Sequence, residues 1–176
     1  ENSYILNLTT NGLMPKKIER ETKKMTKIGI ARLIVVVSMD GPENLHDRIR
    51  GIQGNWKKAL KTYTKLRELS KKTNLQTFLG YTISSHNQGM IEKTIQEVGK
   101  EVGTDFEDFH FNVYHESSLY YGNEKSEKMK KEQILKDVDY VLGRKRGLGP
   151  INQIEKKYLK RIKNYFESGC PLPCKA

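Results

Sequence analysis

The stretch that most constrains the fold is an apolar run that ends abruptly in polar residues. Residues 33–51 read Leu-Ile-Val-Val-Val-Ser-Met-Asp-Gly-Pro-Glu-Asn-Leu-His-Asp-Arg-Ile-Arg-Gly. Val and Ile on both faces are typical of a strand buried in a parallel sheet. The run ends at Ser38 and Asp40, and a turn at Gly41-Pro42, a charged loop and a helix follow it. A buried strand that leads into a polar loop is how α/β proteins present ligand sites.

Patterns typical of strands and helices alternate along the rest of the chain. Strands are expected at residues 4–8, 31–38, 76–84 and 109–114, and helices at residues 15–28, 54–72, 87–102, 124–142 and 150–167. Alternation with long crossovers predicts an α/β fold in which helices cover a parallel sheet. Four such units fit either a small doubly wound domain or part of a larger barrel. No Gly-x-Gly-x-x-Gly or P-loop motif supports a Rossmann or nucleotide triphosphatase fold.

Composition restricts the class of protein further. The 176 residues are enough for one ordinary core and carry a net charge of +11. Basic residues are mixed with glutamates along the expected helices, which favours solvated helix surfaces over a nucleic-acid or other polyanion site. No apolar run approaches the ~20 residues of a membrane helix and no signal peptide is visible. Two cysteines near the end of the chain fit a reduced, cytoplasmic protein.

Polar residues gather where the expected strands end. They are Asn11 after the first strand, Ser38 and Asp40 after the second, Thr82 and Ser84 on the third, and Asn112, Tyr114 and His115 on the fourth. Ligands of parallel α/β folds bind at the carboxyl ends of strands. Hydroxyls, amides and one carboxylate suit ribose hydroxyls and a polar zwitterion, and they do not form a hydrolytic triad.

Simpler interpretations of the same residues remain open from spacing alone. Residues 9–12 and 40–42 are also typical of turns. Asp47 is also explained by a surface pair with a neighbouring arginine, an interaction usually worth little. The four histidines lack metal-ligand spacing, which favours surface or packing roles for them.

A resemblance gives these residues a more specific meaning. Ser-x-Asp-Gly-Pro followed by His-Asp-x-x-Arg-Gly, within residues 33–51, resembles the fourth strand and following loop of radical SAM enzymes. Thr-Thr-Asn-Gly at 9–12 is similar to the end of that family's third strand, and Gly-Asn-Trp at 54–56 to its Gly-x-Phe helix start. The resemblance covers roughly residues 4–115. It implies about four βα units of a TIM-like (β/α)6 barrel, a [4Fe-4S] cluster and S-adenosylmethionine.

The resemblance also implies roles for individual residues. Ser38 and Asp40 are expected beside the ribose or methionyl part of S-adenosylmethionine, and Arg50 at its carboxylate. A guanidinium suits a carboxylate because it donates two hydrogen bonds to it. Asn11, Thr82 and Ser84 are expected to line the barrel mouth. Asn112, Tyr114 and His115 are expected on the substrate side.

The chain departs from the family at its metal motif. It lacks the Cys-x3-Cys-x2-Cys motif and the Gly-Gly-Glu of the second strand. We therefore expect residues 1–169 to be a partial barrel whose cluster-binding units precede them, inactive as it stands. Cys170 and Cys174 are expected either to be free thiols or to begin a truncated C-terminal extension at 170–176, of the SPASM or twitch type, with ligands of an auxiliary Fe–S cluster.

Two function classes follow from these expectations. The first is an enzyme that cleaves S-adenosylmethionine reductively with an electron donor and acts on an unknown peptide or small molecule. The alternative is a non-catalytic basic α/β module that binds RNA or another polyanion. The substrate is beyond what the fold alone can select.

Overall fold

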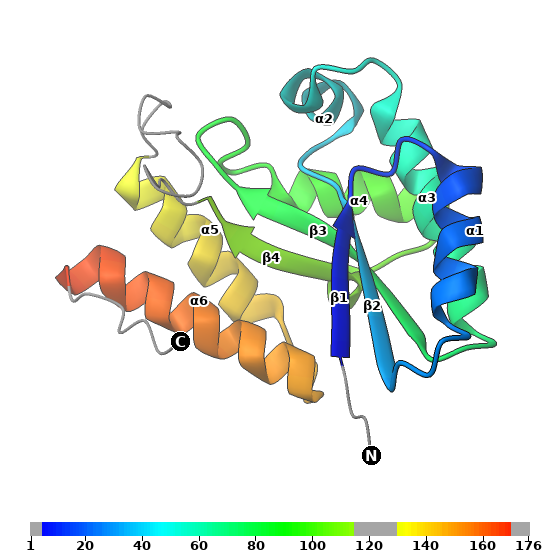
Figure 1. The fold of residues 1–176 in the computed structure, drawn as a ribbon. Helices are drawn as coiled ribbons and strands as arrows, with labels where there is room; N and C mark the ends of the chain where they lie inside the picture. Colours follow the sequence, from blue (N-terminus) through cyan, green and yellow to red (C-terminus); the bar gives the residue numbers. More distant parts are fainter. Residues whose placement is uncertain (1–4, 115–129, 170–176) are drawn as a thin grey trace, which may run out of the picture.

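The chain folds around one parallel β-sheet, with helices packed on both of its faces (Figure 1). The computed structural model describes residues 5–114 and 130–169. The strands are β1 (Ile5–Thr10), β2 (Arg32–Ser38), β3 (Leu75–Ile83) and β4 (Phe109–Val113), in the spatial order β1-β2-β3-β4. Every neighbouring pair is parallel. The expected α/β fold is confirmed, and the sheet is compatible with a partial parallel β/α barrel.

The helices follow the expected alternation. They are α1 (Pro15–Met25), α2 (Glu43–Arg50), α3 (Asn55–Ser70), α4 (Ile91–Val102), α5 (Lys131–Arg144) and α6 (Pro150–Ser168). Each expected strand is confirmed to within two residues at either end. Helix α1 ends at Met25, before the expected end at residue 28, and α4 begins four residues late because residues 84–90 form a turn. The expected start of the fifth helix, at 124, lies outside the described residues.

The charged stretch after β2 is a helix, so its prediction as a loop is wrong. Pro42 stands at the N-cap of α2 with φ −54°, a value that its ring fixes. Glu43 lies in the first turn, where a negative charge is favourable. Gly51 ends the helix in the left-handed conformation. These end signals define a helix of eight residues whose apolar spacing is too sparse to identify it.

The main core lies on the sheet face that packs against α3 and α4. Leu33, Val35 and Val37 of β2 are buried there, together with Trp56 and Tyr63 of α3. Val and Ile suit this position because branched side chains pack well on a pleated surface. This layer fixes the strands and leaves the opposite face free to form a site.

The turn between β1 and α1 is packed directly on α3. Gly12 has φ +73°, and a Cβ there would come within 2.7 Å of the backbone of Ala59. Thr62 donates its hydroxyl to the Gly12 carbonyl at 2.7 Å. Only glycine meets both demands, because it tolerates positive φ and has no Cβ.

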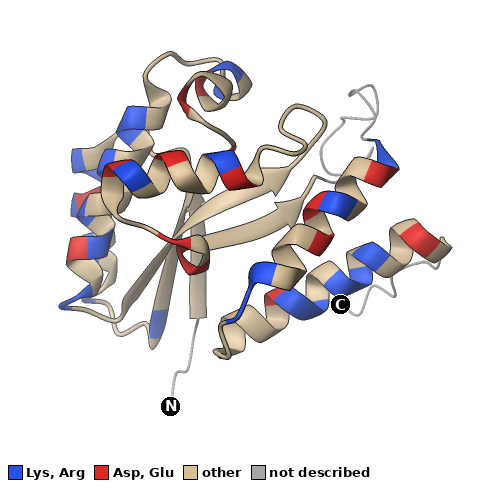
Figure 2. Cartoon of the chain, turned by 180° about the vertical axis from the view of Figure 1, so that it is seen from behind, with Lys and Arg blue, Asp and Glu red and all other residues tan. Residues whose placement is uncertain are grey.

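Charged residues are distributed over the helices. Figure 2 shows Lys and Arg interspersed with Asp and Glu along the helices. Several of these residues pair, such as Lys65 with Glu19 at 2.5 Å. None of the described helices combines the length and apolar character needed to cross a membrane.

Candidate functional site

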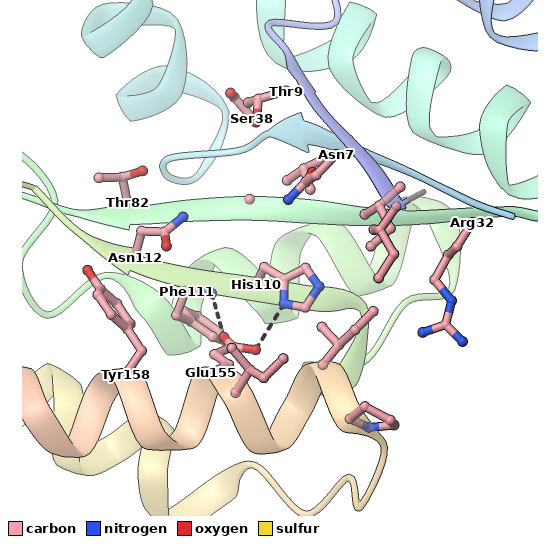
Figure 3. A pocket seen from close by; sticks show the side chains of 17 residues that line it. Asn7, Thr9, Arg32, Ser38, Thr82, His110, Phe111, Asn112, Glu155 and Tyr158 are labelled. Carbon is pink, nitrogen blue, oxygen red and sulfur yellow. Dashed lines mark hydrogen bonds and ion pairs between the residues drawn. The ribbon is translucent and has the colours of Figure 1, made fainter. Parts of the chain in front are cut away.

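A cavity of about 500 Å³ lies between α6 and the sheet face opposite the main core (Figure 3). Strands β1 to β4 form one wall of it, and the first turns of α6 form the other. Six polar residues of the strands line the cavity without a side-chain partner among the described residues. They are Asn7, Thr9, Arg32, Ser38, Thr82 and Asn112. A cavity of this size with unpartnered polar groups is typical of a ligand site.

Strand register places Ser38 and His110 at the same level of this wall. Ser38 of β2 pairs with Gly80 of β3, which pairs with His110 of β4. Two inter-strand spacings therefore separate Ser38 from His110, which is about 10 Å. Gly80 has no side chain to fill the space between them, and a Cβ there would come within 2.6 Å of Val36. Thr82 and Asn112 pair with one another two residues further along their strands.

Asp40 is buried and holds Arg50. Its Oδ2 lies 2.5 Å from Nη2 of Arg50, and its Oδ1 accepts the Thr82 N–H at 3.4 Å. The Arg50 side chain is 31% exposed, whereas its Nε is buried and has no partner among the described residues. Asp40 therefore fixes the guanidinium beside the strand end and connects it to Thr82 in the cavity wall.

His46, which was not among the predicted site residues, holds the backbone of Asp40 by a hydrogen bond. It is fully buried, its Nδ1 accepts the Asp40 backbone N–H at 3.0 Å, and its Nε2 contacts the Asn55 amide at 3.2 Å. Burial is the largest influence and lowers the pKa of His46, while the Asp40 carboxylate acts in the opposite direction. A neutral ring is required here, because Nδ1 can accept only when it carries no proton.

The Asp47 carboxylate caps the N-terminus of the next helix, α3, instead of forming the surface pair with an arginine that spacing left open. The carboxylate accepts the N–H groups of Gly54 at 2.5 Å and Trp56 at 2.7 Å. The N-terminus of a helix leaves such N–H groups unpaired, and a carboxylate satisfies them well. Residues 46 and 47 of the signature thus anchor helix α2, which carries Arg50 at its C-terminal end.

Ser84 is placed in a turn rather than in the cavity wall. Its N–H and its hydroxyl both donate to Oδ1 of Asn87, at 2.7 and 3.1 Å. The Asn87 amide in turn donates to the carbonyls of Asp40 and Thr82, each at 2.9 Å. Asn87 therefore ties the ends of β2 and β3 together, and no sequence motif marks it.

Two further predicted site residues, Asn11 and Tyr114, do not line the cavity. Asn11 accepts the Leu13 N–H at 3.2 Å and forms a turn beside a groove next to α1. Tyr114 continues β4 through a backbone bond to Ile83 at 2.8 Å. His115, Cys170 and Cys174 lie outside the described residues. The structure therefore brings Ser38, Thr82 and Asn112 together and leaves Asp40 and Arg50 adjacent to them.

Lys145, Glu155 and His110 form a buried charged cluster where α6 meets β4, beside the cavity. Glu155 of α6 accepts from His110 Nδ1 at 2.9 Å and from the Phe111 N–H at 2.6 Å (Figure 3). Lys145, whose side chain is fully buried, lies 3.0 Å from Glu155 and donates to the Phe109 carbonyl at 2.6 Å.

The ionised form of Glu155 is favoured in this cluster. Burial by itself would raise the pKa of Glu155, but the hydrogen bond from His110 and the charge of Lys145 outweigh it and lower the pKa. One sequence signal could have found this residue, because Glu155 interrupts the apolar stripe of α6 at helical spacing with Leu159.

The described residues do not fit an iron–sulfur cluster. Within residues 5–114 and 130–169, no three His, Cys, Asp or Glu side chains group as metal ligands. Cluster binding requires thiolates as a rule, and both cysteines lie outside these ranges. The cavity itself offers hydroxyls, amides and a guanidinium, which suit an organic ligand.

Comparison with known proteins gives one distant relative. No family model matches the chain. It is 27% identical over 92 residues to SkfB, the sporulation killing factor maturation protein of Bacillus subtilis (strain 168). The match covers 52% of this chain and 20% of SkfB, so the chain spans at most a small part of that relative's length. An identity this low over half the chain indicates a distant relationship and leaves the activity open.

Proposed function

We propose that the cavity between α6 and the sheet, here called the inner cavity, binds S-adenosylmethionine. In this proposal the chain is the cofactor-binding part of a radical SAM enzyme. The observation that carries the proposal is the convergence of Ser38, Thr82 and Asn112 on one cavity, none with a side-chain partner among the described residues. The signature at 33–51 and the distant similarity to a maturation protein support the same conclusion.

In this proposal the residues of the chain bind and orient the ligand. Ser38, Thr82 and Asn112 offer hydrogen bonds to ribose hydroxyls and to the amino group. Arg50 receives the methionyl carboxylate with the donors that Asp40 leaves free, since a guanidinium has five N–H groups. In this proposal Asp40 positions Arg50, and His46 in turn holds the backbone of Asp40. Asp40 itself does not contact the nucleotide, which differs from the role that the resemblance implies.

Radical chemistry would be supplied by S-adenosylmethionine together with a reduced [4Fe-4S] cluster. Because the described residues do not fit that cluster, we propose that its thiolates come from polypeptide preceding this chain. That segment should contain the Cys-x3-Cys-x2-Cys motif. Anaerobic reconstitution of the longer polypeptide should load iron and cleave S-adenosylmethionine, and failure of both would contradict the proposal.

Replacement of Arg50 tests the ligand site directly. Arg50→Ala should weaken S-adenosylmethionine binding about 10- to 100-fold, the value of a charged hydrogen bond. Arg50→Lys keeps a positive charge beside Asp40 but loses the planar guanidinium. Its affinity for S-adenosylmethionine should therefore lie between that of the unsubstituted protein and that of Arg50→Ala. Isothermal titration calorimetry measures all three proteins.

The matched control is Arg20→Ala on α1, where the arginine is exposed and pairs with Glu21 beside it. Its affinity should equal that of the unsubstituted protein. Equal affinity in the Arg50 variants, with unchanged melting temperatures, would remove Arg50 from the site.

A further inference from the structure

We propose that His110 is the proton acceptor of the inner cavity and that Glu155 is its positioning residue. In this arrangement Nδ1–H of the ring donates to Glu155, and the unprotonated Nε2 faces the ligand. Nε2 then takes a proton from a hydroxyl, amide or ammonium group of that ligand. The proposal rests on the cavity being a ligand site, but it does not depend on which ligand occupies it.

The first argument is the fixed orientation of the ring. Its Nδ1 lies 2.9 Å from Oε2 of Glu155, and the Phe78 ring packs against it at an interplanar angle of 52°, with ring centroids 4.0 Å apart. Glu155 is itself held by the Phe111 N–H and by Lys145. An ionised carboxylate can only accept hydrogen bonds, so Nδ1 is the donor in its contact with Glu155.

The second argument is the direction of the other ring nitrogen. His110 lines the cavity, and its Nε2 has no partner within the described part of the chain. Figure 3 shows Nε2 on the side of the ring away from Glu155. With Nδ1 protonated, Nε2 of a neutral ring is an acceptor. Ser38 and Gly80 share its level of the sheet, so a ligand held by Ser38 has open space toward His110.

The third argument is the charge balance of the cluster. Lys145 neutralises Glu155 when the ring is neutral, so a proton on His110 makes the cluster positive. The Glu155 carboxylate lies against the imidazolium that forms and stabilises it. In the transfer, the O–H or N–H bond of the ligand breaks, its electron pair stays on the ligand, and the proton moves to Nε2. A carboxylate–histidine pair facing a cavity has the geometry of a general base.

The experiment reads the tautomer and the reactivity of Nε2. Histidine-labelled protein, assigned with His110→Gln, should show the Nδ1–H tautomer by ¹⁵N NMR at neutral pH. Diethyl pyrocarbonate should modify Nε2 of His110, found by peptide mass spectrometry, and should leave the buried His46 unmodified. An Nε2–H tautomer, or an unreactive His110, overturns the proposal.

A double variant separates orientation from packing. Glu155→Gln with Lys145→Met removes both charges and keeps similar volumes. The Gln carbonyl can accept the Phe111 N–H, so its amide N–H faces His110 and forces Nδ1 to accept. The tautomer should then switch to Nε2–H and modification of His110 should be lost. An unchanged tautomer in a folded double variant means that Glu155 does not position the ring, which contradicts the proposal.

Ligand protection distinguishes this proposal from the proposed function. Saturating S-adenosylmethionine should slow modification of His110 at least about tenfold. If calorimetry shows binding while the modification rate stays unchanged, the ring faces away from the ligand and the inference about His110 is wrong. If no binding occurs, the proposed function fails, and the tautomer of His110 decides the present proposal by itself.

Discussion

The two edges of the sheet differ in how their backbone groups are satisfied. The Tyr114 N–H bonds to Ile83 of β3. The backbone N–H and C=O groups of the alternating residues Phe109, Phe111 and Val113 therefore point to the outer edge of β4. Side chains bond to all three, from Lys145, Glu155 and Tyr158. At β1, no strand among the described residues pairs with the outer edge, and Ile5 is 65% exposed.

This difference shows how a parallel sheet can be terminated on one side only. A strand edge with unpaired N–H and C=O groups is a template for further pairing. Side chains occupy those groups on β4, so an added strand there would have to displace a buried ion pair. The β1 edge has no such obstacle, and any extension of the sheet belongs on that side.

Removal of Glu155 should have the largest effect on this comparison. Glu155→Ala leaves Lys145 buried without its counter-charge and Phe111 N–H without an acceptor, which should lower the free energy of unfolding by about 3–5 kcal/mol. Urea denaturation measures the change. Glu68→Ala removes an exposed pair with Lys71 and should cost less than about 0.5 kcal/mol, so equal losses in the two variants would contradict a special role for the β4 edge.

Removal of the Tyr158 hydroxyl should have a smaller effect at the same edge. Tyr158→Phe keeps the ring but leaves the Val113 N–H without its acceptor, at an expected cost of about 1–2 kcal/mol. Hydrogen exchange of that amide should accelerate, and the Phe111 amide should stay protected. Loss of protection at both amides would show that α6 detaches as a whole.

Acid should weaken the two sides of the site at different pH. Burial lowers the pKa of His46, so the unfolded state binds more protons below its ordinary pKa of about 6.5. The stability that neutral His46 provides is therefore present above that pH and is lost as pH falls toward the folded pKa. The pKa of Glu155 is also lowered, from an ordinary value near 4.5, so its contribution is lost only in stronger acid.

Amide exchange measured against pH tests this order. Protection of the Asp40 N–H, which His46 accepts, should fall at a higher pH than protection of the Phe111 N–H, which Glu155 accepts. Simultaneous loss would indicate one cooperative acid transition in place of two local ones.

Substitution at the open edge should have the smallest effect. Ile5→Thr replaces one exposed β-branched residue by another and should change the free energy of unfolding by no more than about 0.5 kcal/mol. A loss above about 2 kcal/mol in chemical denaturation would mean that the β1 edge is covered in solution.

The strands could be predicted because their signal is local. Runs such as residues 33–37 are apolar and rich in β-branched residues, and no helix pattern competes with them. Helix α2 was not predicted, because its end signals at Pro42, Glu43 and Gly51 flank a short, charged segment without a long apolar stripe. Local end signals are easily interpreted as a turn when the segment between them is charged.

The candidate site could be predicted only where strand ends reveal it. That Ser38, Thr82 and Asn112 line one cavity could be expected, because parallel strands place their carboxyl ends at one edge. The contact of His110 with Glu155 could not be predicted, because it joins residues 45 positions apart and needs the packing of α6 on the sheet. The same holds for His46 and Asn87, which both hydrogen-bond to backbone groups that carry no sequence signature.

The close packing of Gly12 on α3 limits how far the end of β1 could adjust to a further strand at its open edge. Ala59 and the Thr62 hydroxyl of α3 hold the turn at Gly12 that follows β1. The end of the strand therefore has little freedom to adjust to an incoming segment. The conformational entropy lost on pairing therefore falls on the incoming segment alone. Affinity at this edge should rise with the stiffness of that segment, and β1 would dictate the register of the pairing.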